Sequence, residues 1–418
     1  MEIFKFGGAS VKDATGVKNF MSMLKKLDKK EVLIVISAMG KMTNAFEEIV
    51  NVYHQNGTNL NDLLDEARLF HSNIIDELKF DQKSSIHGDL DIIFKDISNF
   101  LKKNNSTDYN YIYDQIVSKA EFISTKICSA YLGSYGIENE WLDVRNCIKT
   151  DSDFRRAKVD WDLSTKAIRK MVNTSGITIT QGFIGSDNYG KTTTLGREGS
   201  DYTAGIFAFC LNADRVSIFK DVPGVLNADP REFEQTCLIE QISYKEAIEM
   251  AFYGASVIHP KTLQPLQRKG IPLLVRSFLD VDSKGTYVGS ELDIVPEIPC
   301  FIVKKNQILI SISDKEFNFV VENDISEIFG FLHDLKIKVN LIQNSAISFS
   351  LCIEDNFNNF DALMVKLKPR YKVKYNENLT LYTIRHFDDD AMNLLEKGKE
   401  VLLKQRSRET VQIIVNAK

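Results

Sequence analysis

Two segments of the sequence combine residue types that suit phosphate chemistry. In the first, Lys5 interrupts the apolar stretch at residues 3–6 and stands directly before Gly7 and Gly8. At the carboxyl end of a parallel strand, where α/β sheets bind ligands, such a lysine would neutralise a transferring phosphoryl group. A lysine in a strand can instead protect a sheet edge from unwanted pairing. The two glycines that follow favour the phosphoryl role.

The second segment is rich in glycine and leads into an apolar helical pattern at residues 200–212. Five glycines lie in residues 182–199. Glycine lets backbone N–H groups approach an anion closely, and a helix N-terminus adds a favourable dipole. Glycine content alone is equally compatible with a loop of positive φ angles in which Ser200 caps the helix. Arg197 and Asp201 strengthen the ligand interpretation, and we expect no Walker-type loop as the phosphate site.

The elements around these segments alternate between strand and helix patterns. Residues 31–37 form a nearly continuous apolar run, which is typical of a parallel strand covered on both faces. Residues 59–136 show helical periodicity with few turn signals. Further strands are predicted at residues 177–183, 216–222 and 271–278, with helices near residues 200–212 and 243–253 between them. This alternation predicts an α/β fold with a mainly parallel sheet.

A second region is predicted after a stretch rich in glycine and proline at residues 280–299. From residue 301 the pattern reads strand, helix, strand, strand, helix, strand, which is the ferredoxin-like βαββαβ order. A shorter copy follows without a final helix and strand. We therefore expect a catalytic domain at residues 1–290, a ferredoxin-like domain at residues 301–376 and a shortened repeat at residues 377–418.

Composition supports an ordinary globular protein and excludes several classes. The chain has 418 residues, 44% of them hydrophobic and 26% charged, with a formal net charge of -5. This charge argues against a nucleic-acid or anionic-membrane partner. The six cysteines form no CxxC pair, so neither a zinc site nor a disulfide framework is expected. The N-terminus lacks signal-peptide character and no apolar run could span a bilayer, so a cytoplasmic protein is expected.

Five motifs, in order along the chain, resemble the signatures of aspartate kinases, which are amino-acid kinases with C-terminal ACT domains. They lie at residues 5–10 (KFGGAS), 37–44 (SAMGKMTN), 194–202 (TLGREGSDY), 220–231 (KDVPGVLNADPR) and 254–260 (GASVIHP). The resemblance implies a three-layer α/β/α sandwich followed by ferredoxin-like ACT domains. It also implies ATP-dependent phosphorylation of the L-aspartate side chain to 4-phospho-L-aspartate, on the route to lysine, threonine and methionine.

The resemblance also implies roles for individual residues. It assigns Lys5 and Asp201 to catalysis, with Asp201 orienting Lys5 or the metal-bound phosphates. It assigns aspartate binding to Ser37, Thr43, Glu121, Arg197 and Ser200. It assigns nucleotide binding to Lys5, Phe6, Gly7, Gly8, Lys220, Asp221, Leu226, Arg231, Ser256 and Val257. Arg197 can hold a carboxylate bidentately and Glu121 can pair with an ammonium. We expect Mg²⁺ to be held chiefly by phosphate oxygens, with no dedicated protein ligands.

Three positions depart from the family pattern. Many aspartate kinases have tyrosine at the position of Leu226 and lysine at that of Ser256. Lys220 could supply the missing phosphate contact, or could be a solvated lysine at a strand end. In the ACT strand at residues 339–345, where relatives bind an inhibitory amino acid between two subunits, Asn340 replaces a common aspartate. We therefore expect a homodimer through residues 301–418 and weak inhibition by lysine or threonine.

Two other functions remain open at this stage. Another amino-acid kinase, acting on glutamate or acetylglutamate, would lack the motifs at residues 194–202 and 220–231 and the C-terminal repeats. A catalytically silent amino-acid sensor would use the ACT-like region alone, against which the presence of Lys5, Arg197 and Asp201 argues. The length of the chain predicts a monofunctional enzyme without a fused homoserine dehydrogenase.

Overall fold

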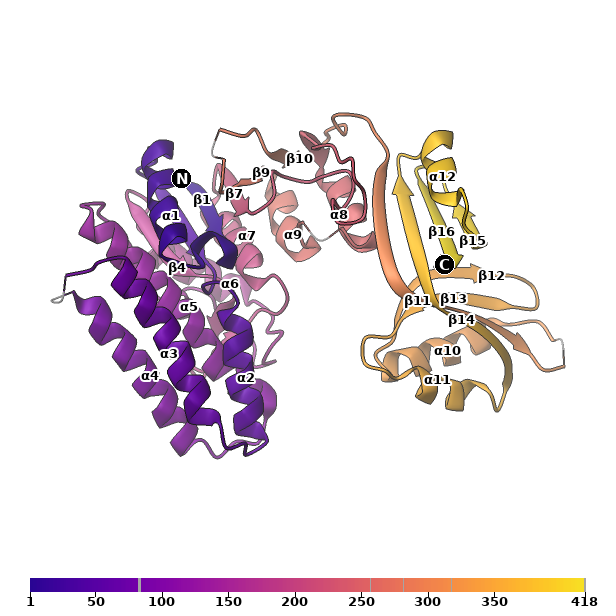
Figure 1. Cartoon of the computed structure of the whole chain (residues 1–418), viewed down its shortest axis with the longest axis horizontal. Helices are drawn as coiled ribbons and strands as arrows, with labels where there is room; N and C mark the ends of the chain where they lie inside the picture. Colours follow the sequence, from indigo (N-terminus) through magenta and orange to yellow (C-terminus); the bar gives the residue numbers. More distant parts are fainter. Residues whose placement is uncertain (82–83, 256, 281, 317, 417–418) are drawn as a thin grey trace. The chain divides into compact units, whose positions relative to one another are not determined.

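The structure is a computed structural model that describes residues 1–81, 84–255, 257–280, 282–316 and 318–416 (Figure 1). It divides into two compact units. Unit 1 comprises Met1–Val225, Leu238–Ile248 and Ser256–Pro296, and unit 2 comprises Leu226–Cys237, Glu249–Ala255 and Glu297–Lys418. None of the helices in these described ranges is long and apolar enough to cross a membrane.

Unit 1 is built on an eight-stranded sheet. Its strands are β1 (Glu2–Phe6), β2 (Val32–Ile36), β3 (Glu140–Leu142), β4 (Ile177–Gln181), β7 (Arg215–Lys220), β8 (Gln241–Ser243), β9 (Leu273–Ser277) and β10 (Thr286–Gly289). Their order is β3-β4-β2-β1-β7-β9-β10-β8, and only the β9–β10 pair is antiparallel. A small separate hairpin pairs β5 (Ile184–Ser186) with β6 (Thr192–Thr194).

Helices cover both faces of this sheet (Figure 1). They are α1 (Ala14–Leu27), α2 (Met42–His54), α3 (Leu60–Glu77), α4 (Ser85–Lys103), α5 (Tyr109–Ser134), α6 (Trp161–Met171), α7 (Gly199–Leu211) and α9 (Pro260–Lys269). A further helix, α8 (Tyr244–Tyr253), begins in unit 1 and ends in unit 2. On one face α5 contacts β2, β3 and β4, and α1–α4 pack around it; on the other α7 contacts β1, β2 and β7, with α6 and α9 beside it. This is the expected three-layer α/β/α sandwich.

The burial of the central strands explains why their apolar runs predicted them correctly from the sequence. Every residue of β2 is fully buried, as expected for a parallel strand covered on both faces. The predicted strands at residues 177–183, 216–222 and 271–278 are confirmed as β4, β7 and β9. The helical region at residues 59–136 is confirmed as α3, α4 and α5. The prediction missed α2, α6 and α9, together with the short strands.

Unit 2 holds a six-stranded antiparallel sheet of order β12-β13-β11-β14-β16-β15. Its elements are β11 (Cys300–Asp314), α10 (Glu322–Asp334), β12 (Lys338–Asn344), β13 (Phe349–Glu354), α11 (Phe360–Leu367), β14 (Tyr371–Arg385), α12 (Asp389–Glu396), β15 (Val401–Arg406) and β16 (Thr410–Asn416). The βαββαβ order is confirmed. Helices α10 and α11 contribute Ile328, Leu332 and Leu363 to a core shared with β11 and β13.

One strand differs from the sequence prediction. The boundary predicted between residues 376 and 377 would divide this segment into two strands of two repeats, but β14 runs without interruption from Tyr371 to Arg385. Asn378 adopts a left-handed φ of 57° within the strand, which asparagine tolerates better than most residues. The polar stretch around Asn378 therefore marks a distortion of one long strand. The division into repeats at residues 301–376 and 377–418 stays a prediction.

Candidate active site

A pocket of about 490 Å³ lies in unit 1, where β1 and β2 end and α7 begins. It is lined by Lys5, Gly8, Ser37, Ala38, Gly40, Thr43, Tyr113, Glu121, Arg155, Phe183, Gly196, Arg197, Glu198, Gly199, Ser200, Asp201 and Lys220. Strand β1 pairs with β2 on one side and with β7 on the other. The pocket lies at the carboxyl ends of these parallel strands, which is where open α/β sheets bind ligands.

The pocket brings together most of the predicted site residues. Those that line it are Lys5, Gly8, Ser37, Thr43, Glu121, Arg197, Ser200, Asp201 and Lys220. A larger cavity of about 800 Å³ lies elsewhere in unit 1, between the end of α4 and the hairpin β5–β6, but it contains none of the predicted site residues. We therefore take the smaller, charge-lined pocket as the site.

The other predicted residues lie in varied surroundings. The ring of Phe6 is buried and stacks on Phe219 at a centroid distance of 4.6 Å, so its side chain belongs to the core. Gly7 directly follows β1 and precedes a short 3-10 helix (Gly8–Val11), and Asp221 is exposed just after β7. The main-chain oxygen of Val257 accepts a hydrogen bond from Lys220. Leu226 and Arg231 belong to unit 2, where Arg231 pairs with Asp229, and Ser256 lies outside the described residues.

An ionic centre of three residues lies at the floor of the pocket. The Nζ of Lys5 lies 2.6 Å from Oδ1 of Asp201, and the Nζ of Lys220 lies 3.2 Å from Oδ2. Burial would raise the pKa of Asp201, but the two ammonium groups outweigh it and hold that pKa below its usual range. Asp201 also stands in the first turn of α7, where the helix dipole favours a carboxylate. Asp201 therefore fixes two cations side by side at this pocket.

Glu121 supplies a carboxyl group with one unsatisfied oxygen. It projects from α5, is 3% exposed, and its Oε2 has no hydrogen-bond partner within the described structure. Burial raises its pKa to about 8, although Lys5 and the Ala38 backbone act in the opposite direction. A buried polar atom without a partner costs stability and calls for an explanation. An ammonium group of a ligand would satisfy this oxygen and favour the ionised form of the carboxyl group.

Arg197 supplies the opposite charge. Its side chain is exposed at the pocket and forms no ion pair with any residue that the structure describes. It follows Gly196, which has a φ of 79°, a left-handed conformation that glycine adopts without strain. A free guanidinium can bind a carboxylate bidentately. Arg197 and Glu121 together match the α-carboxylate and the α-ammonium of an amino acid.

Ser200 reaches the pocket because a glycine makes room for it. A Cβ on Gly182 would lie 2.4 Å from the Cβ of Ser200, closer than two such atoms can approach. Gly182 follows β4, and Ser200 is the second residue of α7. The glycine-rich segment therefore lets the start of α7 pack against the end of β4, which aims the first turn of the helix at the pocket.

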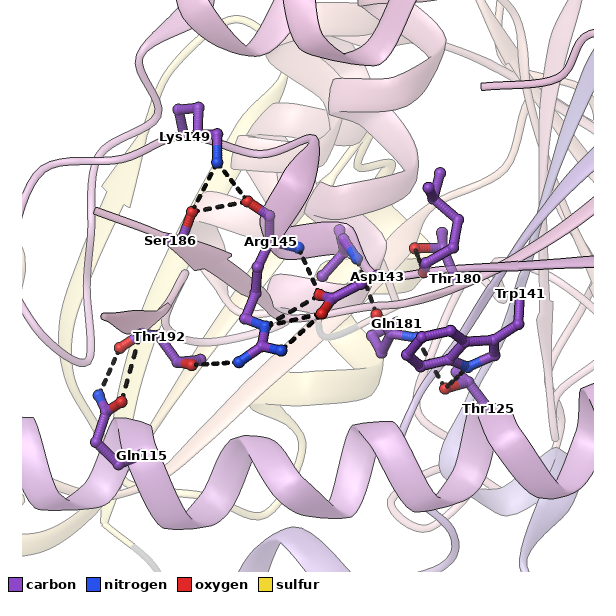
Figure 2. A network of polar contacts seen from close by, with 12 residues as sticks. Gln115, Thr125, Trp141, Asp143, Arg145, Lys149, Thr180, Gln181, Ser186 and Thr192 are labelled. Carbon is purple, nitrogen blue, oxygen red and sulfur yellow. Dashed lines mark hydrogen bonds and ion pairs between the residues drawn. The ribbon is translucent and has the colours of Figure 1, made fainter. Parts of the chain in front are cut away.

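A network of polar contacts connects α5 to β3, β4 and β6 (Figure 2). The side chain of Gln115 on α5 donates to the Thr192 carbonyl at 2.8 Å and accepts from its N–H at 3.3 Å. Thr125, one turn after Glu121, accepts hydrogen bonds from Gln181 and Trp141 at 2.9 and 3.0 Å. Because Glu121 lies between these two attachment points, its position relative to β4 and β6 is fixed.

Sequence reasoning missed several residues of the pocket lining. Glu198 lies inside a motif that was singled out, but only Arg197, Ser200 and Asp201 were given roles there. Its φ of 52° is unusual for a glutamate, its Oε2 has no partner in the described residues, and burial raises its pKa. Tyr113 and Arg155 lie in no motif, so no signal in a single sequence marks them. The structure brings them to the pocket through α5 and the loop before α6.

One segment imitates a phosphate-binding loop without having its structure. Residues 185–192 (GSDNYGKT) do have the spacing G-x-x-x-x-G-K-T, although no Walker-type loop was expected. They form the antiparallel hairpin β5–β6, whereas a Walker loop connects a strand to a helix N-terminus. Lys191 is exposed and lines the larger cavity. The phosphate site is therefore not at this segment.

Comparison with known proteins agrees with this geometry. Residues 1–277 match the amino acid kinase family. Lysine-sensitive aspartokinase 3 of Escherichia coli (strain K12) is 31% identical over 411 residues, which cover 96% of this chain and 89% of the relative. The crystal structure of E. coli aspartokinase III in complex with lysine and aspartate (T-state) superimposes with a TM-score of 0.83 at 28% identity, covering 99% of this chain and 96% of that one.

A second crystal structure, of E. coli aspartokinase III in complex with aspartate and ADP (R-state), superimposes with a TM-score of 0.81 at 28% identity and the same coverage. The sheet topology, the lysine-lined pocket and the match of residues 1–277 define an amino acid kinase. The chain belongs to the amino acid kinase family and, within it, to the aspartokinases.

Proposed function

We propose that this protein is an aspartate kinase that transfers the γ-phosphoryl group of ATP to the side-chain carboxylate of L-aspartate. The product is 4-phospho-L-aspartate, the first intermediate on the way to lysine, threonine and methionine. The observation that supports this best is that one pocket combines two fixed cations, Lys5 and Lys220, with the unpaired Oε2 of Glu121 and the unpaired guanidinium of Arg197. The first pair suits phosphates and the second suits an amino acid.

The proposed mechanism is positioning plus charge neutralisation. Arg197 and Glu121 hold the α-carboxylate and α-ammonium of aspartate, and Ser37, Thr43 and Ser200 offer hydroxyls from the pocket wall. A side-chain carboxylate oxygen attacks the γ-phosphorus as the bond to the ADP oxygen breaks. No base is required, because a carboxylate is already ionised at neutral pH. Lys5, held by Asp201, stabilises the charge on the transferring group.

For the nucleotide, we propose that Lys220 provides the main protein cation on the phosphates. Burial would lower its pKa, but Asp201 and Glu198 hold that pKa above its usual range, so Lys220 stays charged. Phe6, Gly7 and Gly8 shape the turn beside the phosphates, and Asp221, Leu226, Arg231, Ser256 and Val257 remain proposed contacts to the rest of ATP. Replacing Lys220 with alanine should raise KM for ATP more than KM for aspartate.

Magnesium fits this arrangement as an ion carried by the nucleotide. No three His, Cys, Asp or Glu side chains cluster as metal ligands in the described part of the chain. Glu198, whose Oε2 is unsatisfied, is the carboxylate available to such an ion, and phosphate oxygens would supply the other ligands. When bound, the ion would neutralise charge on the β- and γ-phosphates.

We also propose a homodimer through residues 301–418, with lysine or threonine as the effector. This chain aligns with E. coli aspartokinase III over nearly the whole length of both proteins. That relative is lysine-sensitive and has been crystallised with lysine. Size-exclusion chromatography with mass measurement, with and without lysine, tests this assembly. A monomer whose rate and melting temperature ignore both amino acids would show that unit 2 is structural.

The function is tested by a coupled assay of ADP release. L-Aspartate should support turnover, and glutamate and N-acetylglutamate should not. Repeating the assay with lysine, threonine and methionine added tests regulation at the same time. A preparation that binds lysine but releases no ADP with any acceptor would instead support the catalytically silent sensor.

A further inference from the structure

Arg155 is a charged residue of the pocket to which no role has been assigned so far. Its guanidinium stacks on the ring of Tyr113, 4.1 Å from the centroid, and its Nη2 lies 2.9 Å from Oε1 of Glu47. Glu47 lies one helical turn after Thr43 on α2. Arg155 and Tyr113 line the pocket, whereas Glu47 does not. The ion pair therefore joins a pocket cation to an anion outside the pocket.

Hydrogen bonds to a buried carboxylate fix the backbone of Arg155, although this residue lies in a loop. Its N–H donates to Oδ2 of the buried Asp114 at 3.0 Å, and the same carboxylate accepts from the N–H and the hydroxyl of Thr194 at 2.8 and 2.7 Å. Thr194 ends β6, two residues before Gly196. A Cβ on Gly196 would lie 3.2 Å from the Arg155 carbonyl oxygen, so the two loops pack directly together. Arg155 and Arg197 are thus carried by one rigid assembly.

The conformation of Arg155 is also costly. Its φ of 69° lies in the left-handed region, where a side chain with a Cβ is strained. Non-glycine residues with such angles persist only where the surroundings enforce them, and they cluster at functional sites. Asp114 is the group that enforces it here. The strain directs the Arg155 side chain toward α2 and Tyr113, at the pocket.

We propose that Arg155 is a specificity-determining residue on the amino-acid side of the pocket. It supplies a second guanidinium for the acceptor, and it exchanges Glu47 for a carboxylate of aspartate when the substrate binds. Two observations favour this exchange. The Arg155–Glu47 pair is partly exposed, with side-chain exposures of 38% and 33%, so it is weak and can open. Lys5 and Lys220 pair with Asp201 and are proposed to face the phosphates, which leaves Arg155 and Arg197 as the other cations of the described pocket lining that can attract a dicarboxylate.

The inference rests on the proposed function, and its test uses the full-length chain in the ADP-release assay. In Arg155→Gly the side chain is removed and the left-handed backbone is relieved, so melting temperature should not fall. KM for aspartate should rise about five- to tenfold, as expected for loss of a partly solvated charged contact, with kcat and KM for ATP within twofold. Arg155→Lys should fall between this variant and the wild type, because lysine keeps the charge without the planar fork.

Two further variants make the result decisive. Glu47→Gln removes the competing anion and should lower KM for aspartate about twofold, since exposed pairs are worth little. Arg156→Gly, at the neighbouring exposed arginine outside the pocket, is the matched control and should behave as the wild type. An unchanged KM in Arg155→Gly, an equal rise for ATP, or a raised KM in Glu47→Gln would overturn the inference. A wild-type protein without aspartate-dependent turnover would instead overturn the proposed function.

Discussion

The pocket of unit 1 and the polar cluster around Asn340 in unit 2 both contain charged and polar side chains, but they differ in whether these side chains have hydrogen-bond partners within the protein. In unit 1, Oε2 of Glu121 and the guanidinium of Arg197 have no protein partner among the described residues. In unit 2, Asn340 donates to Gln307 at 2.7 Å and to Glu354 at 3.3 Å, and accepts from Lys304 at 2.8 Å. The first arrangement is complete only with a ligand, whereas the second is satisfied from within.

This difference separates a binding site from a structural network. Buried polar groups are normally hydrogen-bonded, so an unsatisfied carboxyl group in a pocket indicates that a ligand completes it. A satisfied network stabilises the fold and offers little to a ligand. Four predictions test whether this contrast holds, beginning with the largest expected effect.

The largest effect is expected when the catalytic cation is removed. Lys5→Met should lower kcat by at least about 100- to 1,000-fold, because a preorganised charge at the transferring group is lost. The fold should survive, since Lys220 still compensates Asp201. Lys304→Met, which removes a half-buried ammonium from unit 2, should leave kcat within twofold while lowering the melting temperature. Steady-state kinetics and thermal unfolding of both variants measure this, and a Lys5→Met enzyme with near-normal kcat would contradict the assignment.

A smaller effect should follow from Glu121→Gln. The free carboxyl group has a pKa of about 8, and an ammonium ligand favours its ionised form, so aspartate binding below that pH releases a proton. KM for aspartate should therefore fall as pH rises from 6 to 8. The Gln variant should have a KM about 10- to 100-fold higher and a flatter pH profile. KM for ATP over the same range is the control, and an identical slope in both enzymes would exclude Glu121 as the ammonium site.

His71 is a buried residue with an unsatisfied nitrogen that lies outside the pocket. It therefore tests whether an unsatisfied polar group indicates a ligand site only when it lies in a pocket. Its Nδ1 donates to the Ala67 carbonyl, its Nε2 has no partner in the described structure, and Phe46, Phe70 and Phe94 surround the ring. Burial lowers its pKa from 6.5 to about 4, so the unfolded chain takes up a proton first as pH falls. Stability should therefore be lost from pH 6.5 down to pH 4, by roughly 3 kcal/mol in all.

Urea unfolding at several pH values measures this loss, and His71→Leu should reduce the slope between pH 6.5 and 4. Activity with aspartate near neutral pH should be retained, because His71 lies outside the pocket lining. Unchanged pH dependence of stability in His71→Leu would show that other groups dominate acid unfolding. A change in KM for aspartate or ATP in His71→Leu would contradict the contrast, because it would link an unsatisfied group outside the pocket to ligand binding.

The smallest effect is expected in unit 2. Asn340→Leu would leave Gln307 and Lys304 without their partner, which should cost about 1–2 kcal/mol of unfolding free energy for a half-buried network. Gln343→Leu, at an exposed position of the same strand, should change stability by less than about 0.5 kcal/mol. Turnover should stay at the wild-type level in both variants. An Asn340→Leu protein as stable as the Gln343→Leu protein would show that the network is not structural.

Much of the fold was predictable because the sequence shows its periodicity directly. Strand β2 is a continuous apolar run that both helical layers cover, and α7 follows a glycine-rich segment. Short strands such as β5 and β6 were not predicted, because three residues are too few to show a hydrophobic periodicity. The spacing in residues 185–192 was overlooked, and it would have been a misleading signal, since spacing alone does not distinguish a hairpin from a strand-to-helix loop.

The site was predictable where chemistry and motif coincide, and unpredictable where it depends on packing. The sequence by itself determined that Lys5, Arg197 and Asp201 would stand beside glycine turns, because local chain geometry requires those glycines. Only the tertiary structure decided that Asp201 would compensate both Lys5 and Lys220. It also decided that Glu121 would be buried without a partner and that Arg155 would reach the pocket in a strained conformation. These features arise from contacts between residues far apart in the chain, and no local pattern encodes which distant charges will meet.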